Sequence, residues 1–173
     1  MQLPLQRNLD QGILTVIDGS GATVHREEGV DDVECRGGLV AYRKGTTLRL
    51  LGPDGRVRGT WEDVTTYHVS TRLLAFRRGD DFLVVGAEGA LLHQIQEVDT
   101  FAVGDEFVLA AGNGRLRMIS STGSLVHQAE GVVGWEIVSD PDDPDLAVVT
   151  TEKKRIVLSA DGRVVHSSSR SAP

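Results

Sequence analysis

Apolar and polar residues alternate in short runs along the whole chain, and turn-forming sequences bound each run. Between residues 99 and 130 the runs are DTFAVG, EFVLAAG, RLRMIS and SLVHQAE, separated by GD, GNG and STG. Short runs of branched and large apolar residues between such turns are typical of β-strands. Connections this short join antiparallel strands, because parallel strands need a long crossover. We therefore predict a four-stranded antiparallel meander, and we find no sustained helical periodicity.

This four-strand unit is repeated five times along the chain. The repeats are anchored by the glycines that open the pentapeptides GATVH, GRVRG, GALLH, GSLVH and GRVVH, namely Gly21, Gly55, Gly89, Gly123 and Gly162. These glycines are separated by 34, 34, 34 and 39 residues. A valine follows each of the first four at the same distance: Val30, Val64, Val98 and Val132. A fixed period of this size is typical of repeat architectures, so we predict one domain of five repeats over residues 1–173.

A four-stranded antiparallel meander repeated in this way resembles the blade of a β-propeller, in which sheets pack face to face around an axis. The turns DGSG, PDG, STG and ADG before the last strand of a unit are similar to the Asp/Gly turns of PQQ-like and WD40-like propeller repeats. The chain has no Trp-Asp dipeptide, and histidine or glycine stands where PQQ-like units carry tryptophan. The resemblance implies an all-β fold, a five-bladed β-propeller of four-stranded antiparallel blades. It carries over no cofactor-binding residue, and we expect no cofactor.

The first repeat begins at the second strand of the unit, whereas the last repeat ends at the fourth strand. The first unit contains only LQRNLD, GILTVID and ATVHREE, which correspond to the second, third and fourth strands of the other units. The last unit ends with its fourth strand, RVVHSSS. We therefore predict that the first blade lacks its innermost strand. An unpaired strand edge invites β-augmentation by another chain or by a second copy.

Four of the pentapeptides end in histidine, at His25, His93, His127 and His166. In a propeller these residues lie on the outermost strands, which three strand spacings of ~4.8 Å place ~15 Å outside the innermost strands. Equivalent positions on neighbouring blades diverge there, whereas two imidazoles that share a zinc ion each need a nitrogen ~2 Å from the metal. We predict that these histidines pack between blades and form local hydrogen bonds.

The innermost strands converge on the axis and supply the better candidate site. Their repeated apolar positions, which include Cys35, are assigned to the core between blades, so this cysteine is expected to act as a small hydrophobic residue. The position between these apolar columns is occupied by Glu34, His68, Ala102 and Glu136. Glu34, His68 and Glu136 could hold a divalent cation or orient a polar ligand. The alternative is that they line a hydrated channel and pair with one another or with Arg36.

Charged residues are segregated between two sets of turns at one end of the predicted blades. Basic residues cluster in the hairpins between the second and third strands, including Arg43, Lys44, Arg77 and Arg78, and acidic residues cluster in the connections between units. The two sets either neutralise each other on a solvated rim, where an exposed pair contributes only ~0 to 1 kcal/mol, or form a charged face that binds a partner protein. Trp61 has no aromatic counterpart in the other repeats, so we consider it a candidate exposed anchor for that partner.

The last repeat contains an insertion, SDPDDPD, between its first two strands. It brings together Asp140, Asp142, Asp143 and Asp145. Carboxylate oxygens are calcium ligands, but the stretch lacks the glycine and the distal glutamate of an EF-hand loop. The alternative is an acidic surface loop without a metal.

Composition narrows the classes of function. A net charge of -7 disfavours general binding to nucleic acid or to an anionic membrane. The N-terminal sequence has no apolar run of signal-peptide length, so we expect a cytoplasmic protein. A single cysteine forms neither an internal disulfide nor a thiolate zinc site. We predict a non-catalytic scaffold for protein–protein interaction or self-association. Two alternatives stay open: a small-ligand or carbohydrate-binding propeller, and a metal-assisted hydrolase that uses Glu34, His68 and Glu136.

Overall fold

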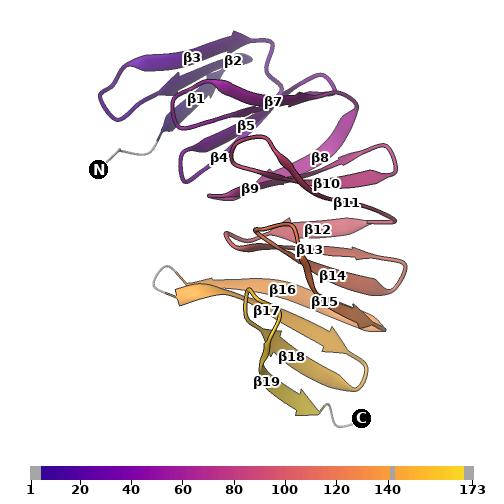
Figure 1. The fold of residues 1–173 in the computed structure, drawn as a ribbon. Helices are drawn as coiled ribbons and strands as arrows, with labels where there is room; N and C mark the ends of the chain where they lie inside the picture. The colour runs from indigo at the N-terminus through magenta and orange to yellow at the C-terminus, as the bar shows by residue number, and fades with distance from the viewer. Residues whose placement is uncertain (1–4, 141–142, 170–173) are drawn as a thin grey trace.

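The computed structural model describes residues 5–140 and 143–169, and these residues form five antiparallel sheets that follow one another along the chain (Figure 1). We call the sheets blades 1 to 5. Blade 1 consists of β1 (Gln6–Asp10), β2 (Ile13–Ile17) and β3 (Thr23–Glu28). Blade 2 consists of β4 (Asp32–Arg36), β5 (Leu39–Lys44), β6 (Thr47–Leu51) and β7 (Val57–Trp61). Blade 3 consists of β8 (Val64–Val69), β9 (Leu73–Arg78), β10 (Asp81–Gly86) and β11 (Leu91–Gln96).

Blade 4 consists of β12 (Thr100–Val103), β13 (Phe107–Gly112), β14 (Arg115–Ser120) and β15 (Leu125–Glu130). Blade 5 consists of β16 (Val132–Asp140), β17 (Asp143–Thr151), β18 (Lys154–Leu158) and β19 (Val164–Ser169). Each blade is a simple meander, and its last strand begins with a bulge at the same repeat position. The prediction of five antiparallel blades is confirmed, and among residues 5–140 and 143–169 the first blade has three strands and no innermost strand, as predicted.

The hydrophobic core is divided among the four junctions between successive blades. One cluster of buried residues joins blades 1 and 2, and further clusters join blades 2 and 3, blades 3 and 4, and blades 4 and 5. The second strands β5, β9 and β13 are buried at four successive positions, because a blade packs on each of their faces. Cys35 is half-buried against the first cluster, as predicted, and burial raises the pKa of its thiol. The clusters of the described residues do not join blade 5 to blade 1, and these two blades lie at opposite ends of the row (Figure 1).

The anchor glycines lie in the turn before the outermost strand of each blade. All five have a positive φ, between +73° and +86°, a conformation that glycine adopts without steric cost. From the second blade onward this turn also packs on the preceding blade: a Cβ at Gly123 would overlap the backbone carbonyl of Leu92. At Gly21 a Cβ would meet nothing within 4 Å, because no blade lies before blade 1 among the described residues.

The insertion in the last repeat is largely strand rather than loop. It lengthens β16 and β17 to nine residues each, whereas the corresponding strands of blades 2 to 4 have four to six. The expected acidic surface loop is therefore wrong for most of the stretch, because pairing between the two strands continues to Asp140 and Asp143. Within the described residues, no helix has the length and apolar character required to cross a membrane.

Candidate functional site

A hollow of 1070 Å³ lies where the innermost strands β4, β8, β12 and β16 converge. These strands line it together with Arg7 from β1 and with the turns that follow β8 and β12. Glu34, His68 and Glu136 all line it. The three polar residues of this column therefore face a common space.

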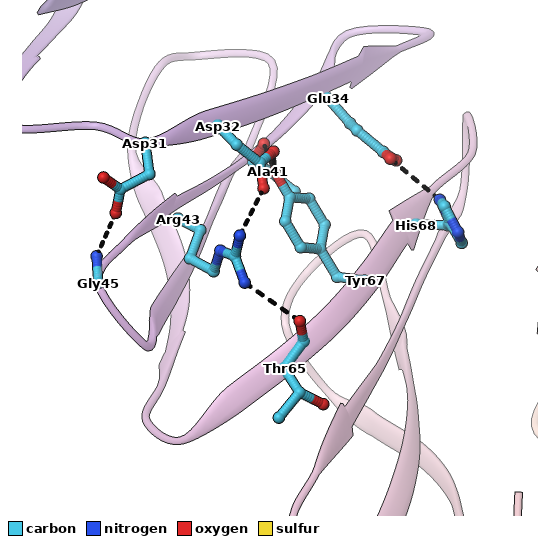
Figure 2. A network of polar contacts seen from close by, with 9 residues as sticks. All are labelled: Asp31, Asp32, Glu34, Ala41, Arg43, Gly45, Thr65, Tyr67 and His68. Atoms are coloured by element: carbon cyan, nitrogen blue, oxygen red, sulfur yellow. Dashed lines mark hydrogen bonds and ion pairs between the residues drawn. The ribbon is translucent and has the colours of Figure 1, made fainter. Parts of the chain in front are cut away.

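Glu34 and His68 form a pair that joins blade 2 to blade 3 (Figure 2). The distance from His68 Nδ1 to Glu34 Oε1 is 3.0 Å, and the backbone N–H of Val69 donates to Glu34 Oε2 at 2.9 Å. The hydrogen bond to Glu34 raises the pKa of His68 against the opposing effect of burial. Burial alone would raise the pKa of Glu34, but the hydrogen bonds from His68 and Val69 outweigh it and lower that pKa. Both shifts favour the imidazolium–carboxylate form of the pair.

The third candidate, Glu136, is bonded elsewhere. Its Oε1 lies 3.4 Å from Arg155 Nη2, within blade 5. Among the residues that the structure describes, no three His, Cys, Asp or Glu side chains are placed to hold a metal ion. The three axial candidates thus share a hollow without forming a metal centre, and Glu34 and His68 pair as in the channel interpretation. Binding of a polar ligand by them stays a prediction.

Two aspartates tie the turns around the hollow together, and the sequence reasoning missed one of them. Asp105 Oδ1 accepts a hydrogen bond from the backbone N–H of Thr71 in blade 3 at 3.0 Å. Asp145 Oδ2 accepts one from the backbone N–H of Asp105 at 2.6 Å, and Asp145 is only 8% exposed. The GD turn at Asp105 was a signal, because aspartate in turns commonly bonds backbone amides, but its partner in another blade could not be read from it.

The buried position of Asp145 changes the calcium hypothesis. Its carboxylate is already occupied by a backbone amide, so it fastens blade 5 to blade 4 instead of facing solvent as a metal ligand. Asp142 lies outside the described residues, and so do the side chains of Asp140 and Asp143. The calcium hypothesis for these three stays untested.

The repeated histidines contact the next blade along the chain. His25 Nε2 lies 3.2 Å from the Tyr42 hydroxyl, and His93 Nδ1 donates to the carbonyl of Gly123 at 2.8 Å. His127 is half-buried, and burial lowers the pKa of His25 and of His127. His166 is exposed on β19, beyond which the described chain places no further blade. The prediction of packing between blades and local bonding is confirmed for His25 and His93.

Trp61 is not an exposed anchor. Its side chain is half-buried against the core between blades 2 and 3, and its ring centroid lies 5.0 Å from that of Phe76. A Cβ at Gly59 would overlap the Trp61 ring. Gly59 is the one anchor pentapeptide position without histidine, so the indole fills the space that a histidine takes in the other repeats. Trp61 in the second repeat thus takes the packing position that histidine occupies in the other repeats, and we call this substitution the packing exchange.

The charged residues of the rim form ion pairs and hydrogen bonds, some of which join neighbouring blades. Arg43 pairs with Asp32 at 3.2 Å and donates to the carbonyl of Thr65 in blade 3 at 3.1 Å (Figure 2). The Tyr67 hydroxyl donates to the same Asp32 carboxylate at 2.5 Å, and burial is the main cause that raises the pKa of Tyr67. Lys44 pairs with Glu27 at 3.1 Å. Mutual neutralisation on the rim is therefore confirmed for Arg43 and Lys44.

The other two basic candidates are less constrained. Arg77 is half-buried and donates to the carbonyl of Asp99 at 3.4 Å, whereas Arg78 is exposed. Whether the rim binds a partner protein stays a prediction for all four basic residues.

β1 borders the hollow with an edge that no described strand covers. It pairs only with β2, and its five residues are all exposed, whereas the equivalent strands β5, β9 and β13 are buried. Arg7 reaches from β1 to donate to the carbonyl of Val33 on β4. The Cys35 thiol lies 3.8 Å from the carbonyl of Leu5, just before β1. These contacts hold β1 beside blade 2 while its edge faces the place of the missing strand.

Comparisons with known proteins identify the fold. Neither a scan against protein-family models nor a search of curated proteins finds a match. Among solved structures, KlHsv2 with loop 6CD replaced by a Gly-Ser linker is similar, with a TM-score of 0.55 and 11% identity over 99% of this chain and 67% of that one. Kluyveromyces marxianus Hsv2 matches with a TM-score of 0.55 and 11% identity over 97% of this chain and 62% of its own. Kluyveromyces lactis Hsv2p matches with a TM-score of 0.53 and 10% identity over 95% and 63%.

These similarities show a β-propeller fold and nothing beyond it, because identity is low. The chain spans about two thirds of the length of the propellers it matches.

Proposed function

We propose that this chain is a non-catalytic β-propeller scaffold that binds an extended segment of a partner protein along β1. The observation that carries the proposal is the uncovered edge of β1 beside the axial hollow. An exposed strand edge offers a row of backbone donors and acceptors, and a peptide that adds a strand satisfies them. The bound segment would take the place that β4, β8, β12 and β16 hold in the other blades.

The repeat predicts one feature of the bound segment. In blade 2 the innermost strand places Glu34 opposite Ala41, and in blade 5 it places Glu136 opposite Val148. Arg7 occupies the position of Ala41 and Val148 in the first repeat, and it lines the hollow. A carboxylate in the bound segment opposite Arg7 would make a charge-assisted hydrogen bond. We therefore expect a partner segment with an acidic residue at that register.

The non-catalytic part of the proposal rests on how the polar groups of the hollow are used. Glu34 is bonded to His68, Asp105 to a backbone amide, Asp145 to another, and Glu136 to Arg155. Each of these carboxylates already serves a contact within the protein. A cytoplasmic location and kinship of the repeats with PQQ-like or WD40-like units belong to the same proposal.

The test is a selection of binders from a random peptide display library, followed by mapping with backbone amide NMR. We expect selected peptides to shift and protect amides of β1 and to share an acidic position. Arg7→Glu should weaken their binding about tenfold or more, because it replaces a charge-assisted bond by repulsion. Arg26→Glu is the matched control, since Arg26 lies on β3 of the same blade and is exposed.

Two results would reject the proposal. One is a set of binders whose amide shifts lie away from β1. The other is equal loss of affinity in Arg7→Glu and Arg26→Glu when both variants unfold at the wild-type denaturant concentration.

A further inference from the structure

Each blade has two faces, and we call the face toward the next blade its forward face. Four apolar residues of the second and third strands form it in blades 2 to 4. They are Leu39, Ala41, Leu48 and Leu50 in blade 2, Leu73, Ala75, Phe82 and Val84 in blade 3, and Phe107, Leu109, Leu116 and Met118 in blade 4. The repeat assigns Leu146, Val148, Arg155 and Val157 to the same positions of blade 5. Blade 5 therefore keeps three of four apolar packing positions. No described blade covers this face, where Val148 is already buried and Leu146 and Val157 are half-buried.

Two adjacent valines on β19 show that this face is built for packing. Val164 is 54% exposed, and its counterparts Val57, Leu91 and Leu125 are similarly exposed, at 48%, 55% and 48%. Val165 is 58% exposed, but its counterparts Val24, Leu92 and Val126 are partly buried against the cores between blades, and the counterpart in blade 2 is the half-buried Arg58. Only the second valine occupies a position that the repeat normally covers. Val138 adds a further exposed apolar side chain, 46% exposed, on the inner strand of blade 5.

The opposite end of the chain does not offer a complementary face. The face of blade 3 that receives blade 2 carries Leu74, Phe76, Leu83 and Val85. The matching positions of blade 1 are Gln6, Asn8, Thr15 and Ile17. Three of these four are polar, so blade 1 is a poor cover for blade 5, whether within one chain or head to tail between copies. We therefore consider the forward face of blade 5 in a second copy as the occupant.

We propose that the forward face of blade 5 is a self-association surface, on which the same face of a second copy docks about a twofold axis. Charge supports this occupant. Glu136 and Arg155 lie 3.4 Å apart, with side chains 60% and 55% exposed. A twofold axis near this pair places Arg155 of each copy opposite Glu136 of the other, so these two residues can pair between copies. The valines at 138, 157 and 165 then supply apolar contact, as in aligned packing of two sheets.

The dimensions of the face set the expected strength. Four strands spaced ~4.8 Å apart, with about five residues of ~3.3 Å rise each, give a face of roughly 15 by 17 Å. Two such faces in contact bury on the order of 500 Å² in total, below the ~1,200 Å² of stable specific interfaces, and this size fits a weak, transient contact. We therefore expect a dimer in equilibrium with monomer, formed progressively as concentration rises from micromolar to millimolar. The inference is independent of peptide binding at β1.

The test is sedimentation equilibrium of the full chain over this concentration range. Val165→Asp should weaken dimerisation about tenfold or more, because it places a charge in the covered patch. Val164→Asp is the matched control and should leave it unchanged. Arg155→Glu and Glu136→Arg should each weaken the dimer through like-charge contacts across the twofold axis, and the double reversal should restore it.

A mass that stays monomeric at every concentration would overturn the proposal. Equal effects of Val164→Asp and Val165→Asp would also overturn it, and so would a dimer that Arg7→Glu abolishes while both valine variants retain it. That last pattern would place the contact on β1 instead.

Discussion

The contact between successive blades at the anchor glycines leads to a sharp comparison of two substitutions, Gly123→Ala and Gly21→Ala. The two glycines have nearly the same φ, +84° and +86°. They differ in surroundings, because an added Cβ at Gly123 would overlap the backbone carbonyl of Leu92, whereas at Gly21 it would meet nothing within 4 Å. The pair therefore separates the cost of the backbone conformation from the cost of packing against the preceding blade.

The magnitude follows from three contributions to the free energy of unfolding. A left-handed conformation costs alanine roughly 1–2 kcal/mol, and the loss of unfolded-state freedom returns about 0.4–1 kcal/mol. Gly21→Ala should therefore lose about 1 kcal/mol or less. At Gly123 the added methyl group also forces two backbones apart, and overpacking typically costs a further ~1–3 kcal/mol. We expect Gly123→Ala to lose about 2–4 kcal/mol.

The assay is equilibrium urea unfolding followed by far-UV circular dichroism and tryptophan fluorescence. Both probes are needed, because repeat proteins can unfold in parts and then a single free energy is not defined. In thermal scans the difference of ~2 kcal/mol should appear as about 4–8 °C for a chain of this size. Equal destabilisation by the two substitutions, within about 0.5 kcal/mol, would refute the packing argument.

Three further results are expected. Trp61→Ala should lower the free energy of unfolding by about 2–3 kcal/mol, because it removes a half-buried aromatic side chain. Gly59→His should destabilise the protein when Trp61 is present and should destabilise it less in the Trp61→Ala background. Additive losses of the two substitutions would contradict the packing exchange. In an NMR titration His68 should show a pKa above its usual value, and Glu34→Gln should lower it. Because the pKa of His68 is raised and that of Glu34 lowered in the folded protein, the pair stabilises most between their ordinary pKa values. That stabilisation is ~0 to 1 kcal/mol, because the pair is largely exposed. It declines as pH rises through the pKa of His68 and as pH falls through the pKa of Glu34. If Glu34→Gln lowered the free energy of unfolding equally at every pH, the pair would not be the source of the stabilisation. Tyr67→Phe should lose ~1–2 kcal/mol, because it removes a buried hydroxyl bonded to a carboxylate, and urea unfolding measures it; no loss would show that the bond is not stabilising.

Much of the fold could be predicted because its determinants are local. Alternation of apolar and polar residues and the chemistry of the Asp/Gly turns define each strand within a few residues. The repeat period then gave the number of blades, and the phase of the first unit revealed the missing strand. Glu34 and His68 could be placed together by the same register, since equivalent positions on converging strands must be neighbours.

The candidate site was less predictable where contacts cross between repeats at different positions. Asp105 and Asp145 bond backbone amides in neighbouring blades, and no column of the repeat aligns them with those amides. Trp61 was noticed as an exception, but the direction of its side chain depends on space left at Gly59. Such contacts are set by the packing of one sheet on another, which the pattern of a single strand does not encode.

The sequence by itself determined an all-β chain of five repeats, because strand alternation and turn residues act over short stretches. It determined too which repeat lacks a strand. Only the tertiary structure decided which apolar residues are covered, because coverage depends on whether a blade follows. Val164 and Val165 are adjacent and chemically identical, yet one lies in a column that is exposed in every repeat and the other in a column that is partly buried wherever a described blade follows.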